Sequence, residues 1–239
     1  MTLTPARAIL IAGLTLALAC QACQGPPPAG PVKASDRGAM PRNPRQAFDD
    51  MEEDRFRAAV TGLEFQPRRV IVTDPLPRRD RPAASALVAD GDELLAANRR
   101  TGALAAYTRA VRTDPRSATA WYGLGEALVT RGKTPQALAA YLTAARVDPE
   151  YVGARYGAAM ASARLGRLDD AIAQMQLALE LDPRHAAAHE RLAIWHYYLD
   201  DIETSWRHVQ ATRDLGREPP GQFIARLVAK TPTRRPAGE

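Results

Sequence analysis

The sequence is poor in the residues that disulfide-rich and catalytic proteins depend on. Its 239 residues include only two cysteines, Cys20 and Cys23, and both lie near the N-terminus. The rest of the chain therefore has no disulfide framework. The sequence also lacks a glycine-rich phosphate-binding loop and a nucleophile elbow. We therefore expect a protein that is not an enzyme and that holds no cofactor.

Histidines are also few, and they offer one alternative function. His185 and His189 lie one helical turn apart, and His196 falls close to the same face if the helix is continuous. Two imidazoles at this spacing can share a metal, so a metal-binding or enzyme-accessory protein that uses these three residues is the alternative. A metalloprotease needs a glutamate inside the first pair, but the residues there are all alanine. We expect that these histidines and the fourth, His208, pack in the core or cap helices, and that they form no metal site.

The charge balance does not indicate a nucleic-acid partner. The net charge is +5 and the sequence pI is about 9.5, values that are common among proteins that bind anionic surfaces. However, the charges are interspersed along the chain, and no basic block carries interleaved aromatic residues. We expect no binding to nucleic acid.

Three Asp-Pro steps recur with a fixed period. Asp114-Pro115, Asp148-Pro149 and Asp182-Pro183 are separated by 34 residues each time. A period of this length indicates stacked helical hairpins. Each proline restricts the residue before it to extended geometry and so separates one unit from the next.

The unit over 118–151 shows the helical pattern best. Trp121, Leu124 and Leu128 form one apolar stripe at helical spacing, and Gly132 breaks the first helix. The second helix carries the small Ala137 and the large Tyr141. This pattern resembles the tetratricopeptide repeat (TPR), a helix-turn-helix unit.

The resemblance implies an all-α fold, a right-handed superhelical solenoid of about four hairpins. We place the repeats at about 84–117, 118–151, 152–185 and 186–217, in an array over 83–217. A capping helix over 218–231 is expected because terminal units expose an apolar flank, and 232–239 is expected to be a disordered tail. The third unit packs less well in its first helix, where Arg155 replaces the tryptophan, and the fourth matches least.

The resemblance also implies a binding surface. In TPR proteins, each first helix packs one face on its hairpin partner. The opposite faces line a concave groove that holds an extended peptide or a partner helix. By alignment, the groove residues of this chain are Val88, Asp92, Leu95, Tyr122, Glu126, Val129, Thr130, Tyr156, Met160, Arg164, Glu190, Ile194, Tyr197 and Tyr198. Tyrosines offer contact area with a polar tip, so the groove suits an apolar or aromatic segment. The alternative interpretation is that some of these side chains pack between adjacent repeats and do not bind a partner.

The N-terminus predicts export. Arg7 precedes an apolar run of about a dozen residues, which fits a signal-peptide core and is too short to span a bilayer. The residues that follow, up to Cys20, resemble a bacterial lipobox, so we expect a lipoprotein signal peptide over 1–19 and a lipid on Cys20. An ordinary secretory cleavage site is the alternative. Gln21 points, by resemblance, to the outer membrane, with the protein facing the periplasm.

A proline-rich tether is expected between the anchor and the repeats. It covers 20–82, and a short amphipathic helix is possible over 45–63, with acidic residues in its first half. The whole sequence therefore predicts a lipid-anchored scaffold or assembly factor of the bacterial cell envelope that binds another polypeptide. A purely structural envelope lipoprotein is the second alternative.

Overall fold

The computed structural model describes residues 44–75 and 79–231. The predicted signal peptide over 1–19, the lipidation site Cys20 and the tail over 232–239 lie outside these residues. The chain divides into two units, Met1–Asp50 and Met51–Glu239, and all packing described below lies within the second. Among the described residues, no helix is long and apolar enough to cross a membrane.

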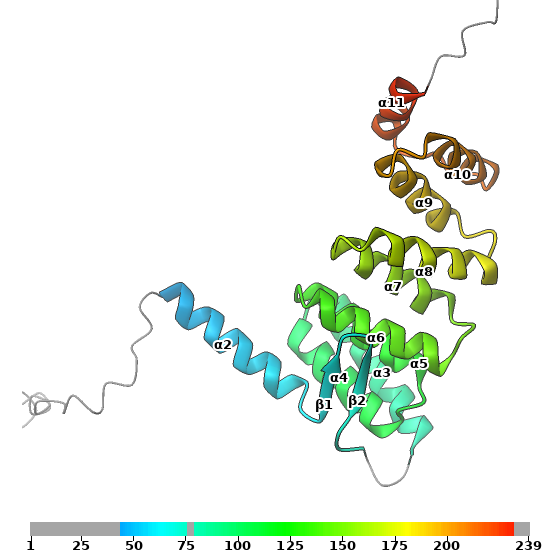
Figure 1. Ribbon diagram of the computed structural model, residues 1–239. Helices are drawn as coiled ribbons and strands as arrows, with labels where there is room; N and C mark the ends of the chain where they lie inside the picture. Colours follow the sequence, from blue (N-terminus) through cyan, green and yellow to red (C-terminus); the bar gives the residue numbers. More distant parts are fainter. Residues whose placement is uncertain (1–43, 76–78, 232–239) are drawn as a thin grey trace, which may run out of the picture. The chain divides into compact units, whose positions relative to one another are not determined.

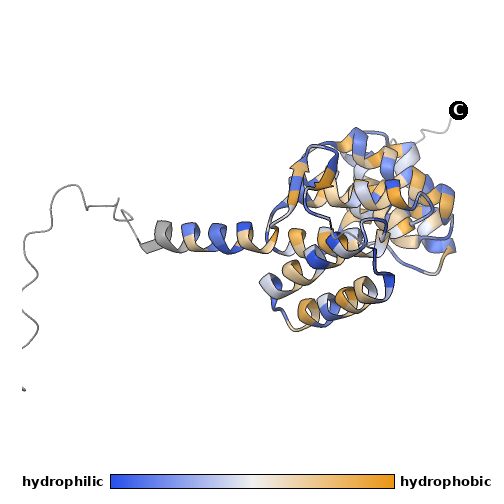
Figure 2. Cartoon of the chain, turned by 90° about the horizontal axis from the view of Figure 1, so that it is seen from below, coloured by the Kyte–Doolittle hydropathy of each residue, from blue (hydrophilic) through white to orange (hydrophobic). Residues whose placement is uncertain are grey.

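Four helical hairpins follow one another along the second unit (Figure 1). The expected all-α solenoid of about four TPR-like hairpins with a terminal helix is confirmed. The helices are α3 (Arg81–Ala96), α4 (Arg100–Thr113), α5 (Ala118–Thr130), α6 (Thr134–Val147), α7 (Val152–Arg164), α8 (Leu168–Leu181), α9 (Ala186–Tyr198), α10 (Ile202–Asp214) and α11 (Gly221–Lys230). Apolar and polar residues alternate along them, as amphipathic packing requires (Figure 2).

The Asp-Pro steps form the turns between hairpins. Asp114, Asp148 and Asp182 each end a second helix in an extended conformation, as a following proline demands. Each side chain also accepts a hydrogen bond from the backbone N–H two residues later, at 3.0 to 3.1 Å. An aspartate is suited to this turn because its short side chain can bond its own backbone. The repeated dipeptide is therefore explained by local backbone chemistry.

The turn inside each hairpin repeats with the same period. Gly132 and Gly166 have φ of 72° and 73°, and the equivalent places in the first and last hairpins are held by Asn98 and Asp200, with φ of 57° and 63°. This left-handed conformation is open to glycine and tolerated by asparagine and aspartate. The first and fourth hairpins thus keep the turn without keeping the glycine.

Two tyrosines fill the gaps between hairpins. Tyr107 and Tyr141 are almost completely buried, and each ring lies against two glycines, one from its own hairpin and one from the next. A Cβ at Gly125 would lie 2.5 Å from Cε1 of Tyr141, and a Cβ at Gly157 would lie 2.8 Å from it. Glycine is needed at these places because no side chain fits beside the ring.

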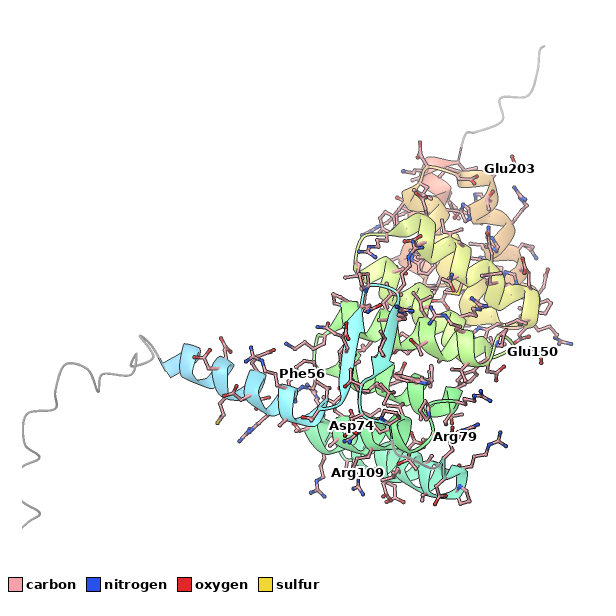
Figure 3. All side chains as sticks on the ribbon, turned by 60° about the horizontal axis from the view of Figure 1, so that its bottom comes forward. Phe56, Asp74, Arg79, Arg109, Glu150 and Glu203 are labelled. Carbon is pink, nitrogen blue, oxygen red and sulfur yellow. The ribbon has the colours of Figure 1, made fainter. Side chains whose placement is uncertain are left out.

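A segment before the repeats packs on the second helices. It consists of the C-terminal part of α2 (Pro44–Ala59), followed by the antiparallel strands β1 (Leu63–Gln66) and β2 (Arg69–Val72). Phe56 on α2 is buried, and Nζ of Lys133 lies 4.5 Å from the centre of its ring (Figure 3). This segment joins the core of the first hairpins.

Polar contacts orient the strands on the array. The backbone N–H of Val70 donates to Oγ1 of Thr143 on α6 at 3.0 Å. Arg112 on α4 bonds the Asp74 carboxylate at 2.5 Å, beyond the end of β2 (Figure 3). The outer side of α6 is therefore covered by the protein itself, and α4 is tied to the same segment through Arg112.

The region before the repeats differs from expectation in two ways. The helix expected over 45–63 ends at Ala59, and Leu63 already begins a strand. The part of the tether from Met51 to Asp74 is folded against the array instead of extended. Two strands of four residues each are stable here because α6 supplies an apolar surface and a hydrogen-bond acceptor.

Candidate partner-binding face

We call the outer sides of α3, α5, α7 and α9 the first-helix face. On α5 the buried stripe of Trp121, Leu124 and Leu128 faces the hairpin partner, and Trp121 donates to the carbonyl oxygen of Pro115 at 2.8 Å. This orientation turns Tyr122 and Glu126 to the other side, where both are half-buried. The packing of each first helix thus decides which residues reach the face.

Aromatic rings pair across neighbouring first helices on this face. The ring of Tyr151 at the start of α7 lies 5.3 Å from that of Tyr122 on α5, in an edge arrangement. One repeat later, the ring of His185 at the start of α9 stacks at 5.1 Å on Tyr156 of α7. Both pairs join residues 29 positions apart at equivalent places of the repeat. We call these two pairs the aromatic ladder.

Two carboxylates lie beside the ladder, each bonded to a buried tyrosine. The hydroxyl of Tyr107 donates to Asp92 at 2.5 Å, and the hydroxyl of Tyr141 donates to Glu126 at 2.6 Å. Burial, reinforced by the bonded carboxylate, raises the pKa of both tyrosines. Burial and the charge of Glu126 raise the pKa of Tyr122 to about 12. All three phenols therefore remain protonated donors at neutral pH.

The end of the chain covers part of the predicted surface. Glu190 is buried and pairs with Arg217 at 2.7 Å. Tyr197 packs at 5.8 Å against Phe223 of α11, and Lys230 lies 4.7 Å from its ring. These two predicted groove residues contact the protein's own C-terminal part, because the sequence pattern of α9 did not show what α11 would cover.

The other predicted residues divide between packing and exposure. Val129, Met160 and Ile194 are partly buried against the hairpin cores. Arg164 and Tyr198 are exposed, Tyr198 to 65 %. The structure thus brings together Tyr122, Glu126 and Tyr156 with Asp92, and it leaves Tyr198 apart from the ladder.

Tyr151 is the member of the ladder that sequence reasoning missed. It occupies the N-cap position of α7, where Ser117 caps the preceding first helix by accepting from Ala120 at 3.2 Å. The tyrosine makes no side-chain cap bond. The sequence did contain a signal for it: a tyrosine stands at a cap position, where its ring does not cap the helix and so has another role.

Of the three histidines of the alternative metal site, His189 and His196 both lie beside His208 of α10, and His185 lies apart from them. His185 accepts from the N–H of Ala188 and caps α9, whereas His189 contacts His208 of α10 through Nδ1 atoms 3.0 Å apart. His196 lies 3.2 Å from Asp201. Among the described residues, no three metal-binding side chains converge. The spacing along one helix therefore does not bring His185 to the other two.

The match to known sequences covers the middle of the array. Residues 88–134 and 127–186 each match the tetratricopeptide repeat family model. This part of the chain is therefore similar to tetratricopeptide repeats. Such repeats generally serve as protein–protein interaction scaffolds rather than as enzymes. No curated protein matches the sequence significantly.

Solved structures show the same fold at low sequence identity. A crystal structure of MamA protein is 19 % identical, with a TM-score of 0.56, over 62 % of this chain and 82 % of that one. The first TPR of Spaghetti (RPAP3), bound to an HSP90 peptide, is 21 % identical, with a TM-score of 0.50, over 52 % and 98 %. TTC0263, a thermophilic TPR protein of Thermus thermophilus, is 21 % identical, with a TM-score of 0.50, over 62 % and 81 %.

Proposed function

We propose that this chain is a non-enzymatic scaffold or assembly factor of the bacterial cell envelope. It captures a segment of a partner polypeptide on the first-helix face of α3, α5 and α7. The HSP90 peptide bound by the TPR of RPAP3 is a precedent for peptide binding by this fold. The aromatic ladder carries the proposal, because its half-exposed rings offer contact area with polar tips.

The covering of the other side supports this choice of face. The outer side of α6 holds the strands β1 and β2 through apolar packing and through the bond from Val70 to Thr143, and Arg112 of α4 bonds Asp74 just beyond β2. A partner that approached the first two hairpins from that side would have to displace the segment. The first-helix face of α3, α5 and α7 carries no such cover among the described residues.

Removing the ladder tyrosines is expected to abolish specific capture. We expect a Tyr122→Ala, Tyr156→Ala variant, crosslinked in living cells, to lose the discrete adducts that the unchanged protein forms, because the main contact area is gone. Leu181→Ala, at an exposed apolar place on α8, is the matched control and should keep them. An adduct pattern unchanged in the double variant would favour the purely structural role.

The envelope location rests on the N-terminal sequence. The apolar run and the small residues before Cys20 support cleavage and lipid attachment there, and the tether limits how far the repeats reach from the membrane. We expect Cys20→Ala to lose labelling by a fatty-acid analogue and to leave the membrane fraction, whereas Cys23→Ala should keep both. Labelling that persists in Cys20→Ala would contradict the lipoprotein assignment and leave ordinary secretion as the alternative.

A further inference from the structure

Asp92 and Glu126 are equivalent residues of the first two hairpins, 34 positions apart. Asp92 accepts the hydroxyl of Tyr107, and Glu126 accepts that of Tyr141 and also bonds Tyr122. An ionised carboxylate has about four acceptor sites, so both keep acceptor capacity for a partner. Neither carboxylate forms an ion pair with any residue that the structure describes. The two hairpins thus present two unneutralised negative charges on one face.

Some other carboxylates near the repeats form ion pairs within the chain. Glu190 occupies the place of Tyr122 in the fourth hairpin and pairs with Arg217 at 2.7 Å. Glu52 pairs with Arg131 at 3.2 Å, and Glu53 pairs with Lys133 at 2.5 Å. With a net charge of +5, the chain has more lysine and arginine side chains than carboxylates. Asp92 and Glu126 differ from these carboxylates in facing a surface without an internal cation partner.

The negative charge is concentrated around the aromatic ladder. Burial, followed by the carboxylates of Asp92, Glu126 and Asp148, raises the pKa of Tyr151. All three acids are therefore close enough to act on this one ring. Arg164 opposes this negative charge, but its effect on the pKa of Tyr141 is smaller than that of Glu126.

Two rings stand where a cation would be held. Tyr122 and Tyr151 meet at an interplanar angle of 63°, so they form two walls rather than a stack. A cation within about 6 Å of a tyrosine ring centre is attracted to its face. Carboxylates next to aromatic rings suit an ammonium or guanidinium group, because the cation forms an ion pair and also contacts the faces of the rings.

We propose that the first-helix face of α3, α5 and the start of α7 recognises lysine or arginine side chains of an extended partner segment. This inference rests on the proposed partner-binding function and specifies its chemistry. The cations pair with Asp92 and Glu126 and contact the rings of Tyr122 and Tyr151. Apolar residues of the same segment contact Tyr156 and Met160 on α7.

The repeat geometry sets the spacing of the cations. Packed helices lie about 10 Å apart, so equivalent residues of adjacent hairpins are separated by about that distance. A peptide in the polyproline II conformation advances about 3.1 Å per residue, and with three residues per turn its residues i and i+3 point to the same side. Cationic side chains three residues apart therefore reach Asp92 and Glu126 together.

The test compares peptides that differ only in charge. The first probe is a fluorescently labelled peptide of alanine and leucine with lysines at its third and sixth positions, and the second has glutamine there. Both are titrated with the full chain in detergent at low salt, and anisotropy gives the Kd. We expect the lysine peptide to bind about tenfold more tightly, through two partly screened ion pairs and ring contacts.

Three variants decide the outcome. Glu126→Gln keeps an acceptor for the Tyr141 hydroxyl and should remove most of the preference for lysine, whereas Glu180→Gln, an exposed carboxylate of α8, should not. Equal binding of both peptides that is lost in Tyr122→Ala would overturn the cation proposal and leave the partner-binding face intact. Absence of any binding that depends on Tyr122 would count against the face itself, and so against both.

Discussion

Replacing Tyr141 by alanine is expected to lower the free energy of unfolding by about 3–5 kcal/mol, the usual cost of removing a large buried ring. The ring is 2 % exposed and lies between Gly125 of one hairpin and Gly157 of the next. Because glycines line both faces of the ring, no side chain at these two places can move into the space. The loss therefore combines the apolar area with an unfilled cavity.

The effect should also spread along the array. In a solenoid each repeat is stabilised by its neighbours, so weakening the contact between the second and third hairpins lowers the coupling between the two ends. Urea denaturation followed by far-ultraviolet circular dichroism should show a lower midpoint and a broader transition. A midpoint unchanged from the unsubstituted protein would contradict the role assigned to the ring.

Two controls separate the ring from its hydroxyl. Tyr141→Phe keeps the ring and removes only the hydrogen bond to Glu126, so its cost is expected to be about 1 kcal/mol. Tyr198→Ala makes the same large truncation at a place that is 65 % exposed, and it should change stability by no more than about 0.5 kcal/mol. The order Tyr141→Ala, Tyr141→Phe, Tyr198→Ala in falling cost is the expected result.

The fold was predictable because its signal is local and repeated. Asp-Pro steps, turn residues and the stripe of Trp121 each recur with one period, and each has a backbone or packing cause that acts within a single unit. His189 illustrates how robust the pattern is. It stands in the place of Trp121 and contacts the Pro183 carbonyl oxygen at 3.1 Å, as the tryptophan contacts that of Pro115.

What the sequence did not show depends on contacts between distant segments. The strands β1 and β2 are too short to be recognised from periodicity, and they are stabilised by α6, more than 70 residues later. Glu190 and Tyr197 occupy face positions by alignment, yet Arg217 and α11 cover them. Tyr151 joins the ladder from a cap position. In each case the partner lies in another repeat or outside the array.

Acid is expected to destabilise the fourth hairpin through His208. Burial, together with the neighbouring His189 and His196, lowers the pKa of His208 to about 4. The groups that face it are these two rings from α9 and Asp201, with Arg207 beside it on α10; Asp201 alone favours the charged form. The Nδ1–Nδ1 contact between His189 and His208 holds only one proton, so the two rings cannot both be charged without breaking it. When both rings are neutral, Nε2 of His189 donates to the Pro183 carbonyl, which leaves its Nδ1 to accept from Nδ1 of His208.

The direction of the pH dependence follows from proton uptake. With a folded pKa near 4 and an ordinary value of 6.5, the unfolded chain binds more protons than the folded one between those pH values. The contribution of His208 is therefore complete above about pH 6.5 and is lost as the pH falls toward 4. The full difference corresponds to about 3 kcal/mol, and water contact of the half-buried ring reduces this to about 2 kcal/mol.

The measurement compares two equivalent substitutions over that pH range. His208→Asn removes the titrating group and keeps a donor near the Nδ1 position. Between pH 7 and pH 4.5 the free energy of unfolding should fall in both proteins, but by about 2 kcal/mol less in the variant than in the unsubstituted protein. His185→Asn keeps the cap of α9 and lies outside the histidine cluster, so it should retain the full dependence. Hydrogen exchange should show the acid-dependent opening in α9 and α10 before α5 and α6, because only the last hairpin contains neighbouring histidines that gain positive charge in acid. Parallel stability curves for the unsubstituted protein and His208→Asn would refute the role of His208, since titrating carboxylates elsewhere contribute equally to both.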